Sequence, residues 1–545
     1  MTRFLVVGGA GVFGSRLVEG LRGIAGAEVM VAGRRAGAGV RLDRTQPDAA
    51  LLRGVAADVV IDAAGPFQGG DLGFARAVIE AGAHYIDLAD ARDFVAAFPS
   101  LDALARARGV AAIAGASSTP ALTHAVIDAL CAGWRRIDGI RAGIAPGGSA
   151  PRGASLVRAI LDWTGAPVRV FADGAWREWR GWSHVETRRI EGLGRRRFAL
   201  AETPDLDLLV AAYAPKEEAL FMAALESPLM QRGLETLSAL RAAGLVQNWT
   251  WAAHALRRLG DALGAFDGDR GGMIVEVLGR DANDAPACAR WRLIAPAGRG
   301  PYTPTLPALA LARRIARGEA LAPGARACVG MLSLREFETD FQRLGFVTTT
   351  EAAPLRSPFE GALGAGFEHL PKSVRRAHQS GPVIRLEGHA RVCGASNPLT
   401  SLAAWLFGFP RAAERVPVSV TKRSAAGAET WVRAFPGRRM KSVLRYAGPA
   451  RVEEQFGPLR FVMAVGASAE GLSMEVIGWR LWGLPLPRRL APRSLAWERP
   501  AAASDSYSFD VPIAAPLLGR LTHYSGELRL AHLEAAQSSA EKMAP

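Results

Sequence analysis

Short apolar runs alternate with amphipathic segments along the first 120 residues. Five of these runs have the length and continuous hydrophobicity of strands buried on both faces of a parallel sheet; they are Phe4–Val7, Glu28–Ala32, Asp58–Ala64, His84–Leu88 and Val110–Ala114. The segments between them repeat their apolar residues at helical spacing; the clearest are Ser15–Leu21, Leu72–Ala81 and Phe94–Arg108. This alternation predicts an α/β fold over residues 1–120, a Rossmann-type doubly wound parallel sheet.

Residues 121–350 have a different pattern, in which strand-like runs flank one long helical region. The runs are Ile137–Ile144, Val168–Phe171, Ser183–Ile190, Met273–Leu278 and Ala289–Ile294. Pro215–Gly264, which begins with the polar triplet Lys216-Glu217-Glu218, has a mostly helical pattern. We therefore expect an α+β substrate and dimerisation domain, whose sheet edges could pair across a two-fold axis in a homodimer. Residues 326–345 hold strand-then-helix material that could return to the Rossmann side.

Residues 351–545 are predicted to be β-rich. The composition shifts at Thr348–Pro358, a linker candidate, and short strand-like runs alternate with turns beyond it. The clearest runs are Val383–His389, Val416–Lys422, Thr430–Phe435, Lys441–Ala447, Ala450–Phe456, Arg460–Ser468 and Leu472–Leu481. Their spacing is typical of an antiparallel meander or a partly closed barrel. Its aromatic residues either form an ordinary core or line a cavity for an apolar ligand; they include Trp405, Trp431, Phe435, Trp479 and Trp482.

A glycine-rich segment lies between the first strand and the first helix. It reads Gly8-Gly9-Ala10-Gly11-Val12-Phe13-Gly14, and in this position the pattern predicts a dinucleotide site. Gly9 would permit the tight turn, Gly11 would let the backbone approach a diphosphate, and Gly14 would let the helix pack on the strand. The N–H groups of the helix N-terminus would face the anion. The turn Ala64-Gly65-Pro66 should lie at the same sheet edge, beside the nicotinamide ribose.

The end of the second strand favours NADP over NAD. An NAD site places Asp or Glu about 20 residues after the glycines, to bond the ribose 2′-hydroxyl. Here Arg34 and Arg35 stand at that point instead. Arginine forks match phosphate oxygens, so we expect NADP (NADPH) as the cofactor. Asp43, after the short strand Gly39–Leu42, could bond the adenine edge.

These motifs resemble a known family. GGAGVFG, AGRR, DAAGPF, HYIDLAD and GASSTPALT are similar, in this order and spacing, to the saccharopine dehydrogenase-like reductases. Ile144–Pro167 and Trp291–Ala308 look like that family's substrate and dimerisation domain, and residues from about 355 on resemble a domain of unknown function often fused behind such reductases in bacteria. The resemblance implies an NAD(P)H-dependent oxidoreductase. The lysine-pathway enzymes use a lysine–histidine acid/base pair, but the first lysine here is Lys216, so saccharopine itself is not implied as substrate.

Candidate catalytic groups must lie at the carboxyl edges of the strands, near the nicotinamide. Side-chain alternation puts Tyr85 and Asp87 on one face of their strand, and either could handle the proton. His124 follows Pro120 in the first turn of a helix, where the helix dipole would lower its pKa. Each has a structural alternative, because Tyr85 and Asp87 can anchor the next loop and His124 can cap or pack.

Two functions follow from this pattern. The first is hydride transfer to or from a C=O, C=N or C=C bond of a small or lipid-like substrate. The second is a catalytically silent NADP-binding sensor or scaffold whose C-terminal domain binds a lipid or other ligand.

Composition and charge limit the classes of binding partner and the cellular location that we expect. The net charge is +14, but only five basic residues are lysines and the arginines are scattered, so we expect no nucleic-acid partner. Four isolated cysteines form no C-x-x-C pair, which predicts no metal site and a reducing, cytoplasmic location. The start of the chain lacks signal-peptide features, and no apolar run is long enough to span a membrane. Thr400–Pro410 is either a core helix or a site of peripheral membrane contact.

Overall fold

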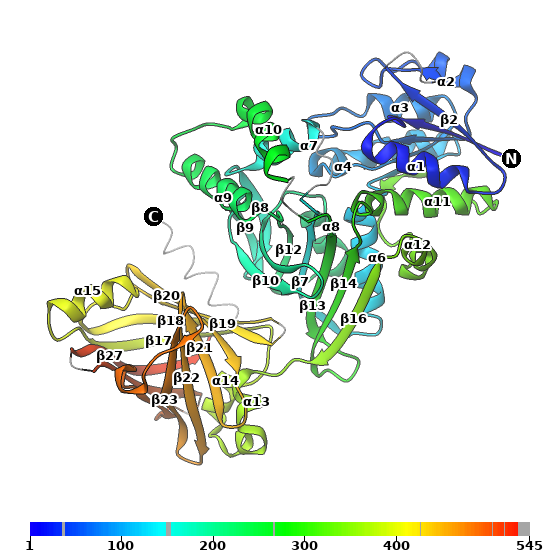
Figure 1. Cartoon of the computed structure of the whole chain (residues 1–545). Helices are drawn as coiled ribbons and strands as arrows, with labels where there is room; N and C mark the ends of the chain where they lie inside the picture. Colours follow the sequence, from blue (N-terminus) through cyan, green and yellow to red (C-terminus); the bar gives the residue numbers. More distant parts are fainter. Residues whose placement is uncertain are drawn as a thin grey trace. The chain divides into compact units, whose positions relative to one another are not determined.

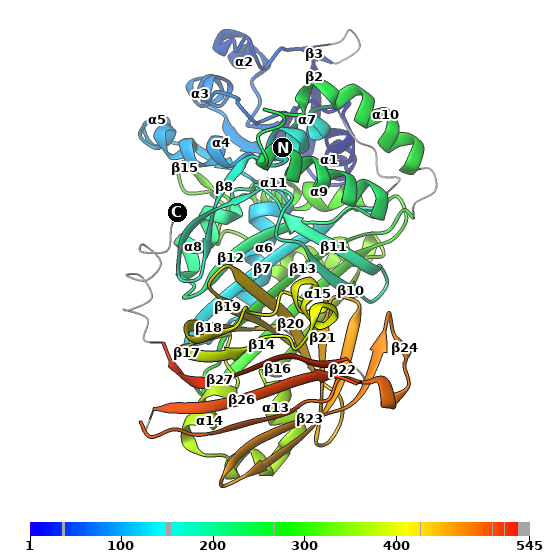
Figure 2. The same cartoon turned by 90° about the vertical axis from the view of Figure 1, so that its left-hand side faces the viewer.

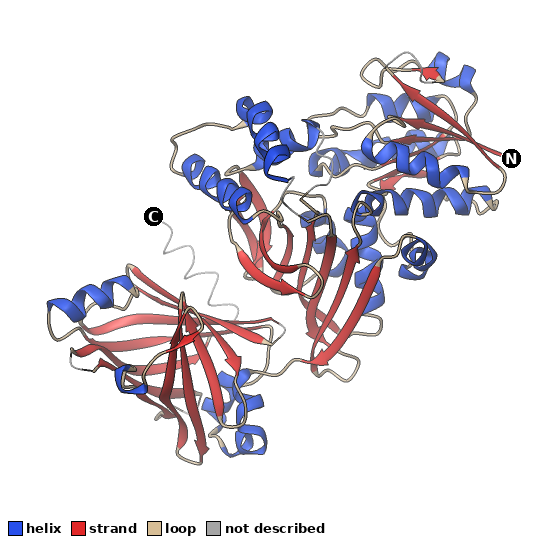
Figure 3. Cartoon of the chain, viewed as in Figure 1, coloured by secondary structure: helices blue, strands red, loops and turns tan. Residues whose placement is uncertain are grey.

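A computed structural model describes residues 1–34, 39–148, 154–264, 268–425, 427–503, 505–516 and 518–531. The chain folds into two compact units. The first comprises Met1–Val277 and Ala289–Ala352, and the second comprises Leu278–Cys288 and the residues from Ala353 on. The first unit mixes helices with strands, whereas the second is built mainly of strands (Figure 3).

A seven-stranded parallel sheet forms the N-terminal part of the first unit (Figure 1), in the order β15-β6-β5-β4-β1-β2-β3. Its strands are β1 (Thr2–Val7), β2 (Ala27–Gly33), β3 (Val40–Arg41), β4 (Val59–Asp62), β5 (His84–Asp87), β6 (Ala111–Ala114) and β15 (Gly324–Ala327). The chain runs from β1 to β3 in one direction and from β4 onward in the other, so the strand order reverses between β1 and β4. This order confirms the predicted Rossmann fold.

Helices cover both faces of this sheet because its strands are apolar on both sides. Phe4 and Val6 belong to the core beneath one set of helices, and Leu5 and Val7 to the core beneath the other. The helices are α1 (Val12–Arg22), α2 (Ala49–Val55), α3 (Gly73–Glu80), α4 (Arg92–Ala97), α5 (Asp102–Ala107), α6 (Thr123–Leu130), α11 (Leu306–Ala316) and α12 (Glu338–Arg343). The predicted single helix Phe94–Arg108 is wrong: the 3₁₀ turn Phe98–Leu101 divides it, since Pro99 cannot donate a helical N–H.

A mixed sheet forms the rest of the first unit, in the order β10-β11-β12-β7-β13-β14-β16, with β8 and β9 attached beside β12. Its strands are β7 (Arg136–Ala145), β8 (Pro167–Ala172), β9 (Ala175–Arg180), β10 (Glu186–Ile190), β11 (Gly194–Leu200), β12 (Glu218–Ala223), β13 (Gly271–Arg280), β14 (Pro286–Ala295) and β16 (Val347–Pro354). Its helices are α7 (Ala154–Trp163), α8 (Asp205–Tyr213), α9 (Pro228–Ala242) and α10 (Ala253–Gly264). The predicted α+β class is confirmed.

Strand β12 corrects the helical interpretation of Pro215–Gly264. The polar triplet that suggested a surface helix leads into a central strand, which pairs in parallel with β7 and antiparallel with β11. Glu218 is buried, and its carboxylate accepts a hydrogen bond from Nε of Arg141 at 2.5 Å. Arg141 thus compensates the buried charge of Glu218. The local sequence around Glu218 does not contain this partner, so its polarity alone suggested an exposed helix.

The second unit contains an eleven-stranded antiparallel sheet. The pairing of β22 with β23 closes ten of the strands into a barrel (Figure 2). Its strands are β17 (Val383–Cys393), β18 (Ala413–Ala425), β19 (Ala428–Phe435), β20 (Arg438–Tyr446), β21 (Arg451–Phe456), β22 (Leu459–Ser468), β23 (Gly471–Leu481), β24 (Leu484–Pro485), β25 (Leu495–Pro500), β26 (Ser506–Ala515) and β27 (Gly519–Leu530). Its helices are α13 (Pro358–Leu363), α14 (Lys372–His378) and α15 (Pro398–Leu406). The predicted β-rich class is confirmed. The barrel is fully closed, whereas the sequence predicted a meander or a partly closed barrel.

Helix α15 is not the core helix considered for Thr400–Pro410. Leu402, Trp405 and Leu406 are each at least 60% exposed. Of the five aromatic residues singled out in the sequence, Trp431, Phe435 and Trp479 face the barrel interior, whereas Trp405 and Trp482 lie on the surface. None of the described helices, α15 included, is both long enough and apolar enough to cross a membrane.

Candidate functional site

The glycine-rich turn connects the end of β1 to the start of α1. Gly8 has a φ of 77°, and its N–H donates to the carbonyl of Ala32 at 2.9 Å. The N–H of Gly11 then turns back to the carbonyl of Gly8 at 2.8 Å. Gly11 is the N-cap of α1 and has no side chain to cap the helix. The first N–H groups of α1, at Val12, Phe13 and Gly14, therefore have no side-chain acceptor at the cap.

Gly8, Gly9 and Gly14 of the turn lie where a side chain would collide, and a Cβ on Gly11 would make a tight contact of 3.1 Å with the Gly8 carbonyl oxygen. A Cβ on Gly9 would come within 2.8 Å of the Val31 side chain, and one on Gly14 within 2.2 Å of the Gly8 carbonyl oxygen. Gly8, rather than Gly9, takes the left-handed conformation that the tight turn requires. Ala10 and Gly11 are exposed. The backbone between Gly9 and Val12 thus faces solvent without a shielding side chain.

The turn lies where the strand order reverses. The N–H of Ala63 donates to the carbonyl of Val7 at 2.9 Å, so the loop after β4 begins beside the loop after β1. A Cβ on Gly8 would approach the Cβ of Ala64 to 2.9 Å. In doubly wound sheets, ligands bind in the crevice outside the carboxyl ends of the strands at this reversal. The structure therefore brings the predicted segments Gly9–Gly14 and Ala64–Pro66 to one sheet edge.

The end of β2 is described only in part. Arg34 is exposed, whereas Arg35 lies outside the described residues. Asp43 accepts hydrogen bonds from the N–H and the hydroxyl of Thr45, at 3.0 and 2.8 Å. These bonds, with a contribution from the charge of Arg34, lower the pKa of Asp43. The Asp43 carboxylate thus stabilises the turn Asp43–Thr45, close to Arg34. Its Oδ1 accepts both of the hydrogen bonds from Thr45.

Arg44 is a site residue that the sequence analysis missed. Its guanidinium donates to the carbonyl oxygens of Ala64 and Pro66, at 2.5 and 3.3 Å, and lies 4.7 Å from the ring centre of Phe67. Its Nε also lies 3.3 Å from the buried carboxylate of Asp62. Arg44 therefore fixes the loop after β4. The available signal was its place three residues after the end of β3. The chain holds 66 lysines and arginines, however, so one arginine is hard to single out.

Two buried carboxylates end the central strands β4 and β5. Asp62 and Asp87 are register partners, and neither is exposed to solvent. Burial raises the pKa of Asp62 to about 6, although the nearby Arg44 charge lowers it in part. Burial likewise raises the pKa of Asp87 to about 7, against two backbone hydrogen bonds that lower it. Asp87 therefore holds its proton in a pH range where an ordinary aspartate has lost it.

Asp87 and Tyr85 share a face of β5, as side-chain alternation requires. Oδ1 of Asp87 accepts hydrogen bonds from the N–H groups of Ala89 at 2.9 Å and Gly115 at 2.7 Å, which ties the loops after β5 and β6 together. Oδ2 of Asp87 has no hydrogen-bond partner among the described residues. Tyr85 is buried against Phe98 with ring centres 5.7 Å apart, and its hydroxyl reaches Asp62 at 3.4 Å.

His124 lies in the first turn of α6 and is completely buried. Its Nε2 is 3.7 Å from Oδ1 of Asp205, and its ring stacks on Tyr213 at 5.2 Å. Burial lowers the pKa of His124 to about 4 and raises that of Asp205 to about 7, so both are neutral near pH 6. The cause differs from the predicted helix dipole: the surrounding core disfavours the charged ring.

The first unit thus has a Rossmann fold with an open glycine turn at the strand reversal. In the second unit, residues 370–528 match the family model of a domain of unknown function, DUF4166. No curated protein matches the chain. Within the described residues, no group of three or more His, Cys, Asp or Glu side chains is arranged to hold a metal ion.

Several solved structures are similar to the chain. Saccharopine dehydrogenase (L-Glu forming) from Saccharomyces cerevisiae aligns with 12% identity and a TM-score of 0.48, over 65% of this chain and 100% of its own. An amine dehydrogenase from Mycobacterium smegmatis aligns with 14% identity and a TM-score of 0.30, over 59% of this chain and 94% of its own. A probable dehydrogenase from Thermotoga maritima aligns with 13% identity and a TM-score of 0.27, over 50% of this chain and 72% of its own.

Proposed function

We propose that the chain is an NADP-dependent oxidoreductase of the saccharopine dehydrogenase-like type. The observation that carries the proposal is the open glycine turn, placed at the strand reversal with an uncapped helix N-terminus behind it. Gly9 to Gly14 would hold the diphosphate, and the loop Ala64–Pro66, fixed by Arg44, would border the nicotinamide ribose. When bound, the cofactor supplies or accepts a hydride at a C=O, C=N or C=C bond of a small or lipid-like substrate.

The preference for NADP rests on the cationic end of β2. Arg34 is exposed there, and its charge contributes to the lowered pKa of the Asp43 carboxyl. A guanidinium in this place matches the 2′-phosphate that NADP has and NAD lacks. Arg35 follows it directly in the sequence.

Asp87 is our first candidate for the proton-handling group. Its Oδ1 is held by two backbone N–H groups, while Oδ2 has no hydrogen-bond partner among the described residues. A carboxyl with a pKa of about 7 can both give and take a proton near neutral pH. Tyr85 and His124 are further candidates, and both have their polar atoms within the protein core.

Cofactor titrations of the full-length protein test the proposal. The double variant Arg34→Ser/Arg35→Ser should bind NADPH at least tenfold more weakly and NADH within about twofold of the unchanged protein, since one charge-assisted bidentate contact contributes about 1.5–3 kcal/mol. Arg22→Ser is the control, because Arg22 is exposed at the opposite end of α1. Binding is followed by calorimetry. An unchanged NADPH-to-NADH ratio in the double variant contradicts the NADP assignment, and absence of binding by either cofactor contradicts the function.

The silent sensor is a second candidate, and one observation favours it. Tyr85, Asp87 and His124 are all at most 1% exposed, so a substrate has no direct path to them in this conformation. The sensor predicts tight NADPH binding without oxidation of NADPH in the presence of any carbonyl, imine or activated alkene tested. Turnover of one such compound, lost in Asp87→Asn, supports the enzyme instead.

A further inference from the structure

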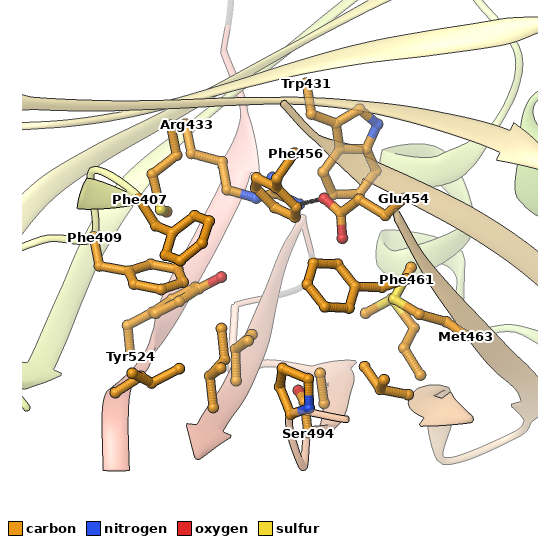
Figure 4. Close-up of a pocket in the computed structure, with 18 of the residues that line it drawn as sticks. Phe407, Phe409, Trp431, Arg433, Glu454, Phe456, Phe461, Met463, Ser494 and Tyr524 are labelled. Carbon is orange, nitrogen blue, oxygen red and sulfur yellow. Dashed lines mark hydrogen bonds and ion pairs between the residues drawn. The ribbon is translucent and has the colours of Figure 1, made fainter. Parts of the chain in front are cut away.

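The barrel of the second unit contains a cavity of about 460 Å³ that is partly open to solvent. Protein interiors are close-packed and contain few voids larger than a water molecule, so an empty volume of this size is not ordinary core. It lies within the range of about 300–1,000 Å³ that small-molecule sites occupy. Its walls are mainly aromatic and aliphatic, with Phe461 and Met463 on one side and Phe407 and Phe409 on another (Figure 4).

The two ends of the barrel are built differently. Helices α13 and α14 lie at one end and α15 at the other (Figure 1). Phe359 of α13 and His378 of α14 pack against Trp431 in the barrel wall, with ring centres 6.0 and 5.6 Å away. These helices therefore plug what we call the inner end. Ala403 and Phe407, from the last turn of α15 and just after it, line the cavity at the opposite end.

Polar groups face the cavity mainly near the inner end. Arg433 lies over the ring of Trp431 at 4.7 Å, donates to the hydroxyl of Ser442 at 2.9 Å and pairs with Glu454 at 3.0 Å. Tyr524 points its hydroxyl toward the middle of the cavity (Figure 4). A ligand that fills this space therefore meets most of the hydrogen-bonding groups at one end and mainly hydrocarbon elsewhere, with Ser494 as a polar exception.

The charges at the inner end are balanced. Glu454 neutralises Arg433, and the Glu498 carboxylate accepts a hydrogen bond from Nε2–H of His378 at 2.5 Å. Behind that histidine, the Lys422 ammonium lies 3.3 Å from its Nδ1. No cation is in excess among these groups, so an anionic ligand end would gain no net attraction here while losing its hydration.

We propose that the barrel binds an elongated apolar molecule with an uncharged hydrogen-bonding end, such as a long-chain alcohol or ester. The polar end lies beside Arg433, Glu454 and Tyr524, and the hydrocarbon extends toward α15. This inference concerns the second unit and goes beyond the proposed reaction at the glycine turn.

Displacement of the neutral fluorescent probe N-phenyl-1-naphthylamine from the full-length protein tests the site. Dodecanol should displace the probe at least tenfold more strongly than dodecanoate. A series of shorter alcohols should lose about fourfold in affinity per methylene removed. Equal or stronger displacement by dodecanoate overturns the uncharged end, and failure of the probe and of both compounds to bind overturns the site.

Matched variants locate the binding. Ala496 lines the cavity, whereas its neighbour Leu495 is exposed on the outside of β25. Ala496→Trp should weaken dodecanol binding at least tenfold and Leu495→Trp should leave it unchanged. Met474→Trp and Glu475→Trp form the same pair on β23, for use if Ala496→Trp does not fold. Equal effects of the inward and outward variants overturn the assignment of the cavity.

Glu454→Gln tests the charge balance directly. It leaves Arg433 without its carboxylate, so dodecanoate should gain at least tenfold in affinity relative to dodecanol. An unchanged ratio contradicts a polar end beside Arg433. NADPH binding by each barrel variant should equal that of the unchanged protein, so a failure here and a failure at the glycine turn are distinguishable.

Discussion

Gly14 illustrates how one absent side chain shapes the nucleotide turn. A Cβ there would lie 2.2 Å from the carbonyl oxygen of Gly8, which belongs to the backbone and cannot move alone. Gly14→Ala should therefore destabilise the protein by about 2–4 kcal/mol and weaken NADPH binding. Gly54, in α2, has open space around it, so Gly54→Ala should stabilise by about 0.5–1 kcal/mol. Denaturant unfolding measures both, and equal effects of the two substitutions would contradict the packing described.

Asp87 gives a prediction about pH. Its pKa is raised from the ordinary 3.8 to about 7, so between these pH values the folded state keeps a proton that the unfolded chain has released. The stability that this proton provides is complete below about pH 4 and is lost as the pH rises through 7, on the order of 1 kcal/mol per pH unit. Asp87→Asn keeps an oxygen for Ala89 and Gly115 but cannot ionise. It should reduce the fall in melting temperature between pH 5 and pH 8.

Asp71→Asn is the control for this variant. Asp71 is exposed and also accepts a backbone hydrogen bond, from Gly73 at 2.9 Å. It should leave the pH dependence between 5 and 8 unchanged. A melting profile of Asp87→Asn that parallels that of the unchanged protein would show that Asp87 is ionised in the fold throughout this range.

At the same scale, the sequence pattern predicted a glycine turn between β1 and α1, but it did not predict the side chains that fix the neighbouring loop after β4. The pattern Gly9, Gly11 and Gly14 is visible because spacing alone defines it. Arg44 and Asp62 are 18 residues apart and meet only when β3 and β4 are placed at one sheet edge. Such contacts depend on tertiary geometry, which local pattern does not contain.

Among the elements, α15 carries the next prediction. Its cavity side holds Ala403, and its outer side exposes Leu402 and Trp405. Exposed Arg411 and Arg415 follow it, and the exposed Glu414 between them is paired with Arg391, so we expect this face to take ligand from anionic vesicles. Leu402→Ser/Trp405→Ser should slow transfer of N-phenyl-1-naphthylamine from phosphatidylglycerol vesicles about tenfold, while dodecanol affinity stays within about twofold.

Leu245→Ser/Trp251→Ser serves as the matched control for α15. Leu245 and Trp251 are 69% and 73% exposed in the first unit. Stopped-flow fluorescence measures the transfer rate. If both double variants slow it equally, α15 has no particular role in delivery.

Elements with strong periodicity were predicted well, whereas those that depend on partners were not. The strands β1 to β6 lie within a few residues of their predicted positions, because continuous apolar runs between glycines define them. Strand β12 was assigned to a helical region because Lys216 and Glu217 before it and its first residue Glu218 are charged, and because the partner of Glu218, Arg141, lies far away in the sequence. The last three barrel strands, β25 to β27, were not singled out. Pro500 and Pro512, with several alanines, interrupt the pattern in β25 and β26, and Gly519 and Gly526 interrupt it in β27.

On the scale of the whole molecule, the sequence predicts the order of fold classes but not the closure of the barrel. Closure requires β17 to pair with β27 and β22 to pair with β23. The first of these pairs joins residues at least 130 positions apart, for example Cys393 and His523. The cavity exists only because the ring of barrel strands is closed. A local sequence pattern therefore could not show which residues lie at the inner end of the cavity.

Hydrogen–deuterium exchange of the full-length protein with and without NADPH is the most direct test of the nucleotide site. We predict slower exchange at residues 8–15 and at Gly33–Arg34 when NADPH is present, with no change in the barrel strands β17 to β27. Saturating NADPH that leaves residues 8–15 unprotected, or that protects only the barrel, would contradict the assignment of the glycine turn as the cofactor site.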